Sequence, residues 1–293
     1  MRLIKFHGLG NDYLVVESTK TPLTPGLVQA LCDRQTGVGA DGVLEPIASQ
    51  VADFGVLIHN PDGSQAEKSG NGLRIFSSFL VKYRSAPSEL RLETPAGVVR
   101  SRVDGSWVEV EMGGGTTEPA RIPADSHVIA LDLGEGFPRQ AYAVGMGNPH
   151  CVVFLDVEFE EVDWRAAGAV LEVDPRFPNR TNVQFARLRS ESDGESSVIE
   201  ARIWERGAGE TQSSGSSASA VAVAAVRSGL CERSFRFVIE MPGGPLQVSL
   251  ERPNLSNAED KALGDIPVMI SGPVEEVCEI RVSDAWLAQA HAD

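Results

Sequence analysis

Several patterns that mark whole classes of protein are missing from this sequence. Its four cysteines, Cys32, Cys151, Cys231 and Cys278, are far apart and show no CxxC or Cys/His spacing. We therefore expect reduced core thiols, with neither a disulfide framework nor a metal site. No apolar run approaches the roughly 18 residues of a membrane-spanning helix, and the opening residues MRLIKF are unlike a signal peptide. These absences predict a cytoplasmic protein with no membrane partner.

Positive charge is also scarce. The chain has 26 Lys and Arg against 41 Asp and Glu, a formal net charge of −15. Because phosphate binding needs a surface of Lys and Arg, nucleic acid is not expected as a partner. The glycine-rich segment TGVGADG at 36–42 lacks both the GxGxxG spacing and the lysine of a phosphate-binding loop, so no nucleotide site is predicted there.

The length and the hydrophobic content are those of an ordinary globular protein. With 293 residues, 42% of them hydrophobic and 23% charged, the chain suits two domains that each bury a core.

Two stretches, 59–81 and 204–226, share a pattern typical of a loop followed by a helix. Each begins with Gly-rich turn residues, reaches a Ser-Gly pair (Ser69-Gly70 and Ser214-Gly215), and then becomes apolar. The first N–H groups of a helix have no intrahelical partner, and the helix dipole adds partial positive charge there. We expect each helix start to accept an anion. The simpler interpretation is that the two serines are ordinary N-caps.

The two stretches also lie in register. Ser69 and Ser214 are 214 − 69 = 145 residues apart, and the same offset, 205 − 60 = 145, relates Asn60 to Glu205. Collinear repeats of this kind indicate an ancient duplication. We therefore predict an α/β protein with two related domains and a ligand cleft between them. Two further repeats occur in the same order, Gly8–Val16 with Gly145–Val153 at offset 137, and Thr94–Val98 with Met241–Pro245 at offset 147.

The coarse secondary structure follows the same plan in both halves. In the first half, short strands precede a helix after Ser69, and a meander of strands follows it up to Met112. The segment Gly113–Gly115 is predicted to be the domain boundary. In the second half, the Ala- and Val-rich helix that follows Gly215 has almost no polar face, which predicts complete burial. The predicted domains are 1–115 and 116–272, followed by a strand at 273–282 and a tail at 283–293.

Nine motifs, in order, resemble those of the diaminopimelate epimerases, which are pyridoxal-independent enzymes. They are HGLGNDYLVVE, GVGADGVL, HNPDGS, SGNGLR, MGNPHCVV, RTNVQF, ERGAGETQ, MPGG and ISGPVEEV. The resemblance implies two pseudosymmetric halves, each with strands wrapped around a central helix, and a last strand that returns to the first half. It also implies an isomerase of lysine biosynthesis that acts on a small amino acid without a cofactor, as a homodimer.

The resemblance further implies a set of substrate contacts. Asn11, Asn60, Asn148 and Asn182 would hold the polar groups of the substrate, and Glu205 and Arg206 would lie near its α-amino and carboxylate groups. Glu205 and Arg206 could alternatively form a structural surface pair. The carboxylate would be cradled by the backbone N–H groups of Gly70, Asn71, Gly215 and Ser216.

The departure from the family pattern concerns the two acid/base positions. The family has Cys where this chain has Ser69 and Ser214. A thiol ionises near pKa 8.5 and an alcohol only near the much higher pKa of water, so forming the alkoxide costs about 10 kcal/mol more. The positive end of a helix dipole offsets at most about 2 kcal/mol of this cost. A serine can act as a base only if another group takes its proton. Three histidines, His7, His59 and His150, lie in the matched loops, with His150 as the candidate auxiliary residue.

Other positions differ from the family as well. Ile75 and Ser219 stand where Cys is common, and Ser217 stands where Gly is usual. These changes fit a natural thiol-free relative as well as a deliberate Cys→Ser double substitution. Three functions stay open: an amino-acid epimerase with Ser69 and Ser214 as acid and base, a one-base isomerase or dehydratase with Glu205 or His150 as base, and a non-catalytic amino-acid-binding protein.

Overall fold

The computed structural model describes residues 1–122, 124–191, 196–231, 234–251 and 265–290. The chain divides into two compact units, and each is described by itself. Unit 1 comprises Met1–Val110 and Gly272–Asp293, and unit 2 comprises Glu111–Ser271. Strands β8 and β17 each carry residues of both units.

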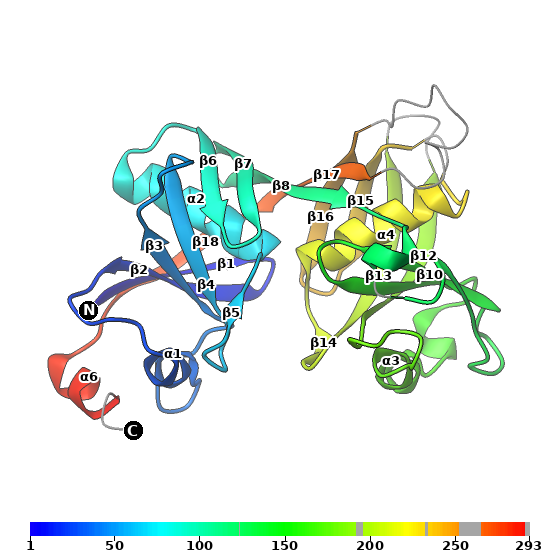
Figure 1. The fold of residues 1–293 in the computed structure, drawn as a ribbon, viewed down its shortest axis with the longest axis horizontal. Coiled ribbons are helices and arrows are strands. Elements are labelled where there is room, and N and C mark those ends of the chain that lie inside the picture. Colours follow the sequence, from blue (N-terminus) through cyan, green and yellow to red (C-terminus); the bar gives the residue numbers. More distant parts are fainter. Residues whose placement is uncertain (123, 192–195, 232–233, 252–264, 291–293) are drawn as a thin grey trace. The chain divides into compact units, whose positions relative to one another are not determined.

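Unit 1 is built around helix α2 (Figure 1). Residues Leu73, Phe76, Phe79 and Leu80 of this helix are almost completely buried. Their spacing of three and four residues places them on one helical face, as the sequence predicts. The elements are β1 (Arg2–Gly8), β2 (Asn11–Ser18), α1 (Pro25–Cys32), β3 (Val43–Ile47), β4 (Phe54–His59), β5 (Gln65–Ala66), α2 (Gly70–Arg84), β6 (Glu89–Thr94), β7 (Gly97–Asp104), β8 (Trp107–Gly115), β18 (Glu275–Arg281) and α6 (Asp284–Ala290).

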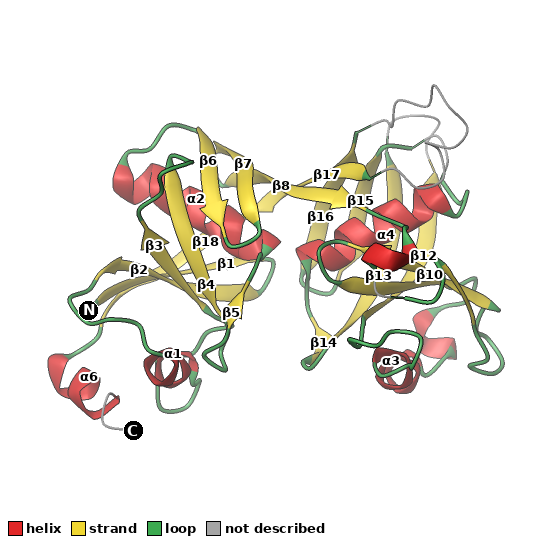
Figure 2. Cartoon of the chain, in the orientation of Figure 1, coloured by secondary structure: helices red, strands yellow, loops and turns green. Residues whose placement is uncertain are grey.

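Unit 2 is built around helix α4, with strands on several of its sides (Figure 2). The helix is buried at Gly215 and from Ser217 to Ala225, so the complete burial predicted from its Ala and Val content is confirmed. The elements are η1 (Pro119–Arg121), β9 (Val128–Ala130), β10 (Gln140–Gly145), β11 (Pro149–Phe154), η2 (Phe159–Glu161), α3 (Trp164–Glu172), β12 (Asn182–Glu191), β13 (Ser197–Glu205), β14 (Gly209–Thr211), α4 (Gly215–Arg227), β15 (Arg236–Met241), β16 (Gly244–Leu250) and β17 (Ile266–Pro273).

The strands of the two units pair in the same sequence. In unit 1, β1–β2 is antiparallel, β2–β3 parallel, β3–β4 antiparallel, β4–β6 parallel and β6–β7 antiparallel. In unit 2, β10–β11, β11–β12, β12–β13, β13–β15 and β15–β16 repeat that order. The mixed α/β class and the internal duplication predicted from the sequence are therefore confirmed. The last strand, β18, pairs with β1 of unit 1.

Two sequence predictions need correction, on the C-terminal tail and on Cys278. The segment Gly113–Gly115, predicted as the domain boundary, is the end of strand β8. A side chain at Gly115 would come within 2.6 Å of Val223, so close packing explains the glycine there. The tail predicted at 283–293 contains helix α6, which buries Leu287, and residues 291–293 lie outside the described part. Cys32, Cys151 and Cys231 are buried thiols, but Cys278 is exposed on β18.

None of the helices in the described residues is long and apolar enough to cross a membrane.

Candidate functional site

In unit 1, helix α2 begins directly after Ser69. The Ser69 backbone is extended (φ −140°, ψ 119°), and its hydroxyl accepts a hydrogen bond from the Gly72 N–H at 3.1 Å. Ser69 is therefore an N-cap, as its position in the sequence predicts. A cap satisfies only some of the free N–H groups in the first turn, and the dipole of the helix favours negative charge at this end. The start of α2 is thus suited to an oxygen anion.

Two of the asparagines expected in the site are joined beside this helix start. Asn71 Nδ2 donates to Asn11 Oδ1 at 3.1 Å, and Asn11 Nδ2 donates to Asp41 Oδ2 at 2.8 Å. The side-chain oxygen of Asn71, Oδ1, accepts from Arg74 Nη2 at 2.6 Å. Arg74 is fully buried, and burial lowers its pKa to about 10. Arg74 and Asp41 therefore fix which way both amides face.

Sequence reasoning missed Arg74 and Asp41 as positioning residues. Both lie inside motifs that carry the family resemblance, SGNGLR and GVGADGVL. Their presence in those motifs was the available signal. The motifs alone do not show which side chains Arg74 and Asp41 contact.

Asp12 lies in a charged cluster next to Asn11. Its carboxylate is 2.8 Å from Lys5 Nζ and accepts from Arg34 Nη2 at 2.7 Å. Burial on its own would raise the pKa of Asp12, but the hydrogen bonds and charges of Arg34 and Lys5 outweigh it and lower the pKa to about 2. Asp12 is therefore ionised at neutral pH, and it fixes the turn that carries Asn11.

Asn60 has local partners in a turn of unit 1. Its Nδ2 donates to Ser64 Oγ at 3.0 Å, and its backbone N–H donates to the Ser64 carbonyl at 2.8 Å. The side chain of Asn60 thus closes the turn that follows β4.

In unit 2, helix α4 begins in the same way. Ser214 has an extended backbone (φ −148°, ψ 124°), and its hydroxyl accepts from the Ser217 N–H at 3.4 Å. Its Oγ is also 3.4 Å from Ser216 Oγ. Ser214 is 7% exposed. The two serines therefore occupy equivalent N-cap positions in the two units.

His150 is buried behind this helix start and is held from both sides. Gln184 Nε2 lies 3.0 Å from His150 Nδ1 and also donates to Ser217 Oγ at 3.0 Å. On the other side, His150 Nε2 is 2.9 Å from Asn148 Oδ1. Burial, aided by the charge of Arg206, lowers the pKa of His150 to about 3. The imidazole is thus neutral, with Nδ1 accepting and Nε2 donating, and it orients Asn148.

This burial predicts a loss of stability in mild acid. The pKa of His150 is about 6.5 in the unfolded chain and about 3 in the folded one. Between these values the unfolded state binds the extra proton, so each pH unit below about 6.5 removes about 1.4 kcal/mol from the free energy of unfolding. From pH 6.5 to pH 5 we expect a loss of about 2 kcal/mol.

Urea unfolding at a series of pH values measures this effect. His150→Phe removes the titrating group, so its stability should depend less on pH between 6.5 and 5 than that of the wild type. The matched control is His127→Gln, which replaces an exposed histidine of the same unit and should keep the wild-type slope. An unchanged slope in His150→Phe would contradict the assignment.

The loop that carries Arg206 is held by Glu172, which sequence reasoning did not single out. Trp204 Nε1 and the Gly207 N–H each donate to the Glu172 carboxylate at 2.8 Å, and Arg180 also pairs with it. Burial would raise the pKa of Glu172, but these three groups lower it. Glu172 ends helix α3, and no motif marks it in the sequence.

Asn182, Glu205 and Arg206 meet at the same loop. The Asn182 amide is engaged with backbone groups at both ends, since Nδ2 donates to the Pro149 carbonyl at 3.1 Å and Oδ1 accepts from the Arg206 N–H at 3.0 Å. The Arg206 guanidinium donates to the Asn179 carbonyl at 2.9 Å. Glu205 ends strand β13 directly before this loop.

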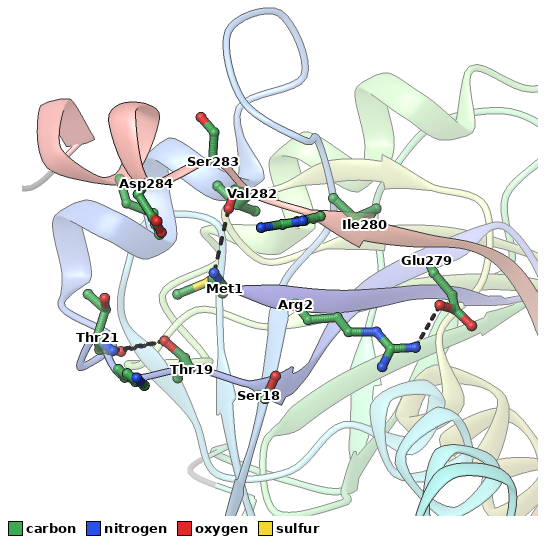
Figure 3. Close-up of a pocket in the computed structure, with 13 residues that line it drawn as sticks. Met1, Arg2, Ser18, Thr19, Thr21, Glu279, Ile280, Val282, Ser283 and Asp284 are labelled. Carbon is green, nitrogen blue, oxygen red and sulfur yellow. Dashed lines mark hydrogen bonds and ion pairs between the residues drawn. The ribbon is translucent and has the colours of Figure 1, made fainter.

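Unit 1 also has an open hollow away from these residues. It lies beside the start of β1 and the end of β18, and the beginning of α6 forms another of its walls (Figure 3). Met1, Arg2, Glu279 and Asp284 are among its lining residues. None of the predicted site residues lines it, so we do not place the site there.

The fold and the two N-cap serines define a class of protein made of two related halves, each with a helix start suited to an anion. A solved structure with this fold is a phenazine biosynthesis protein of the PhzF family from Bacillus anthracis, with a TM-score of 0.67, 15% identity and coverage of 97% of this chain and 99% of that one.

The family model for diaminopimelate epimerase matches residues 3–117 and 142–262. A protein named diaminopimelate epimerase 2 from Nostoc sp. is 44% identical over 262 residues, 86% of this chain and 89% of that protein. The diaminopimelate epimerase of Desulforudis audaxviator is 38% identical over 290 residues, 94% of this chain and 97% of that protein. The chain belongs to the diaminopimelate epimerase family, and it is an enzyme of the isomerase class.

Proposed function

We propose that this protein is a cofactor-independent epimerase that inverts the Cα configuration of diaminopimelate or a similar amino acid, with Ser69 and Ser214 in the acid/base positions. The observation that carries the proposal is the equivalence of the two serines. Each is the N-cap of the central helix of its unit, and each is followed by Gly. Relatives of 37–44% identity are named diaminopimelate epimerase.

The substrate groups would be divided among the residues named above. The first N–H groups of the two helices, from Gly70, Asn71, Gly215 and Ser216, would bind the α-carboxylate, because helix starts favour anions. Polar groups of the substrate would contact four asparagine amides and the loop that holds Glu205 and Arg206. These asparagines are Asn11, Asn60, Asn148 and Asn182.

The same assignment includes a cytoplasmic homodimer. The free cysteines support a reducing compartment. Light scattering of the purified protein at several concentrations tests the dimer, and a monomer at all of them would overturn this part.

Solvent-deuterium exchange tests the reaction. LL- and meso-diaminopimelate are incubated with the protein in D2O, and the Cα protons are followed by NMR. We expect deuterium at Cα together with interconversion of the two isomers. If the protein binds diaminopimelate in calorimetry but exchanges no proton of it or of other amino acids, the epimerase proposal fails and a binding protein remains.

A one-base isomerase or dehydratase is the second candidate, and the contacts of His150 favour Glu205 as its base. Of the two bases considered for it, His150 is buried and has both ring nitrogens engaged, which leaves Glu205. Activity that is lost in Glu205→Gln but retained in Ser69→Ala would favour this candidate over the epimerase.

A further inference from the structure

Ser69 has a second partner besides the helix that it caps. Tyr13 lies on strand β2, and its hydroxyl oxygen is 3.0 Å from Ser69 Oγ, a distance at which either group can donate. Tyr13 is 7% exposed, whereas Ser69 is partly exposed. A ligand at the start of α2 can therefore reach the serine hydroxyl, and the phenol lies on its buried side.

The tyrosine ring is held in this place by the packing around it. A Cβ atom at Gly42 would lie 2.6 Å from Tyr13 Cε1, so only glycine at that position leaves room for the ring. The serine is also fixed, because its oxygen accepts the Gly72 N–H at 3.1 Å. The contact thus joins two groups with little freedom to move.

Unit 2 has a different arrangement at the equivalent positions. The repeat at offset 137 relates Tyr13 to His150, because 150 − 13 = 137. His150 bonds with Asn148 and Gln184, and the Ser214 hydroxyl lies 3.4 Å from Ser216 Oγ and accepts from the Ser217 N–H. A phenol next to the capping serine is therefore a feature of unit 1.

We propose that Tyr13 is the proton partner of Ser69 in this thiol-free enzyme. The inference rests on the proposed epimerase function and deepens it. A phenol ionises near pKa 10, far below an alcohol, so the phenolate forms more readily than the alkoxide and can take the proton that the serine gives up. Tyr13 acts through Ser69 and is in that sense a positioning residue.

The proton transfer balances in both directions. When unit 1 removes the proton, the Cα proton moves to Ser69 Oγ while the serine hydroxyl proton moves to the Tyr13 phenolate, and the C–H electron pair stays on Cα. In the opposite direction, the neutral phenol gives its proton to Ser69 Oγ as the serine hydroxyl protonates the carbanion. Tyr13 thereby supplies the second group that a serine needs.

A double-mutant cycle tests this role. Tyr13→Phe should lower kcat for diaminopimelate exchange about 100-fold, in the range that a positioned acid or base contributes, while KM changes less than about threefold. In a Ser69→Cys background the thiol ionises without help, so Tyr13→Phe should lower kcat less than about threefold there. Tyr142→Phe is the matched control, since its hydroxyl accepts from Gln140 at 2.7 Å in unit 2 and should leave kcat unchanged.

If Tyr13 had a purely structural role, Tyr13→Phe would lower kcat by the same factor with Ser69 and with Ser69→Cys. Equal losses of kcat therefore overturn the inference. So does an unchanged kcat in Tyr13→Phe alone. If Tyr13→Phe does not fold, a fluorinated tyrosine at position 13 keeps the packing and makes the phenol more acidic, and an unchanged kcat would then be the contradicting result. Absence of exchange in the wild type would instead refute the proposed function, which keeps the two failures distinct.

Discussion

Replacing both Ser69 and Ser214 by cysteine is expected to raise the rate of Cα proton exchange about 1,000-fold, within the range that acid–base groups contribute. The alkoxide costs about 10 kcal/mol more than the thiolate. In the structure each serine caps a helix, and the dipole of that helix offsets at most about 2 kcal/mol. A thiol at the same two positions would remove most of the remaining difference.

The same NMR assay measures this gain, with the two single substitutions beside the double one. Ser228→Cys is the matched control because it makes the same chemical change at the other end of α4, where Ser228 follows the last helical residue. We expect the control to exchange at the wild-type rate. A double variant that exchanges no faster than the wild type would count against two-base chemistry and in favour of Glu205 as a single base.

Asp12→Asn is expected to lower the free energy of unfolding at pH 7 by about 2 kcal/mol. The pKa of Asp12 falls from its ordinary value of 3.8 to about 2 on folding, and about 1.4 kcal/mol accompanies each unit. This stability is fully present above pH 4 and is lost as the pH falls toward 2. The asparagine amide would also face the donors of Arg34 and Lys5, which adds to the loss.

Urea unfolding at pH 7 and in steps down to pH 2.5 measures this prediction. The difference in the free energy of unfolding between wild type and Asp12→Asn should become smaller as the pH falls below 4. Asp104→Asn is the control, since Asp104 is exposed at the end of β7 and its substitution should stay within about 0.5 kcal/mol of the wild type. If this difference in free energy stays constant down to pH 2.5, the charge of Asp12 is not its cause.

Local patterns were enough to predict much of this fold. The Ser-Gly junctions at 69–70 and 214–215 mark helix starts because capping and glycine turns are interactions between neighbouring residues. The offsets of 137, 145 and 147 indicated a duplication, and the repeated pairing order of the strands agrees with it. The nine motifs also indicated the family, because they are local runs of residues in a fixed order.

The sequence misjudged segments whose structure depends on distant packing. Gly113–Gly115 has the composition of a linker, but it ends strand β8, and a Cβ atom at Gly115 would lie 2.6 Å from Val223, more than a hundred residues away. The end of the chain was expected to be a tail, but residues Asp284–Ala290 form helix α6, and Leu287 of this helix is buried.

The sequence by itself determined the two related halves, the family and the two Ser-Gly helix starts, because all of these follow from residue identity and spacing. Tertiary structure decided which group accompanies each serine. Tyr13 contacts Ser69, which is 56 residues away in the sequence. His150 lies within hydrogen-bond distance of Gln184, which is 34 residues away. Such contacts arise from strand register and burial, which bring together groups that no local pattern relates.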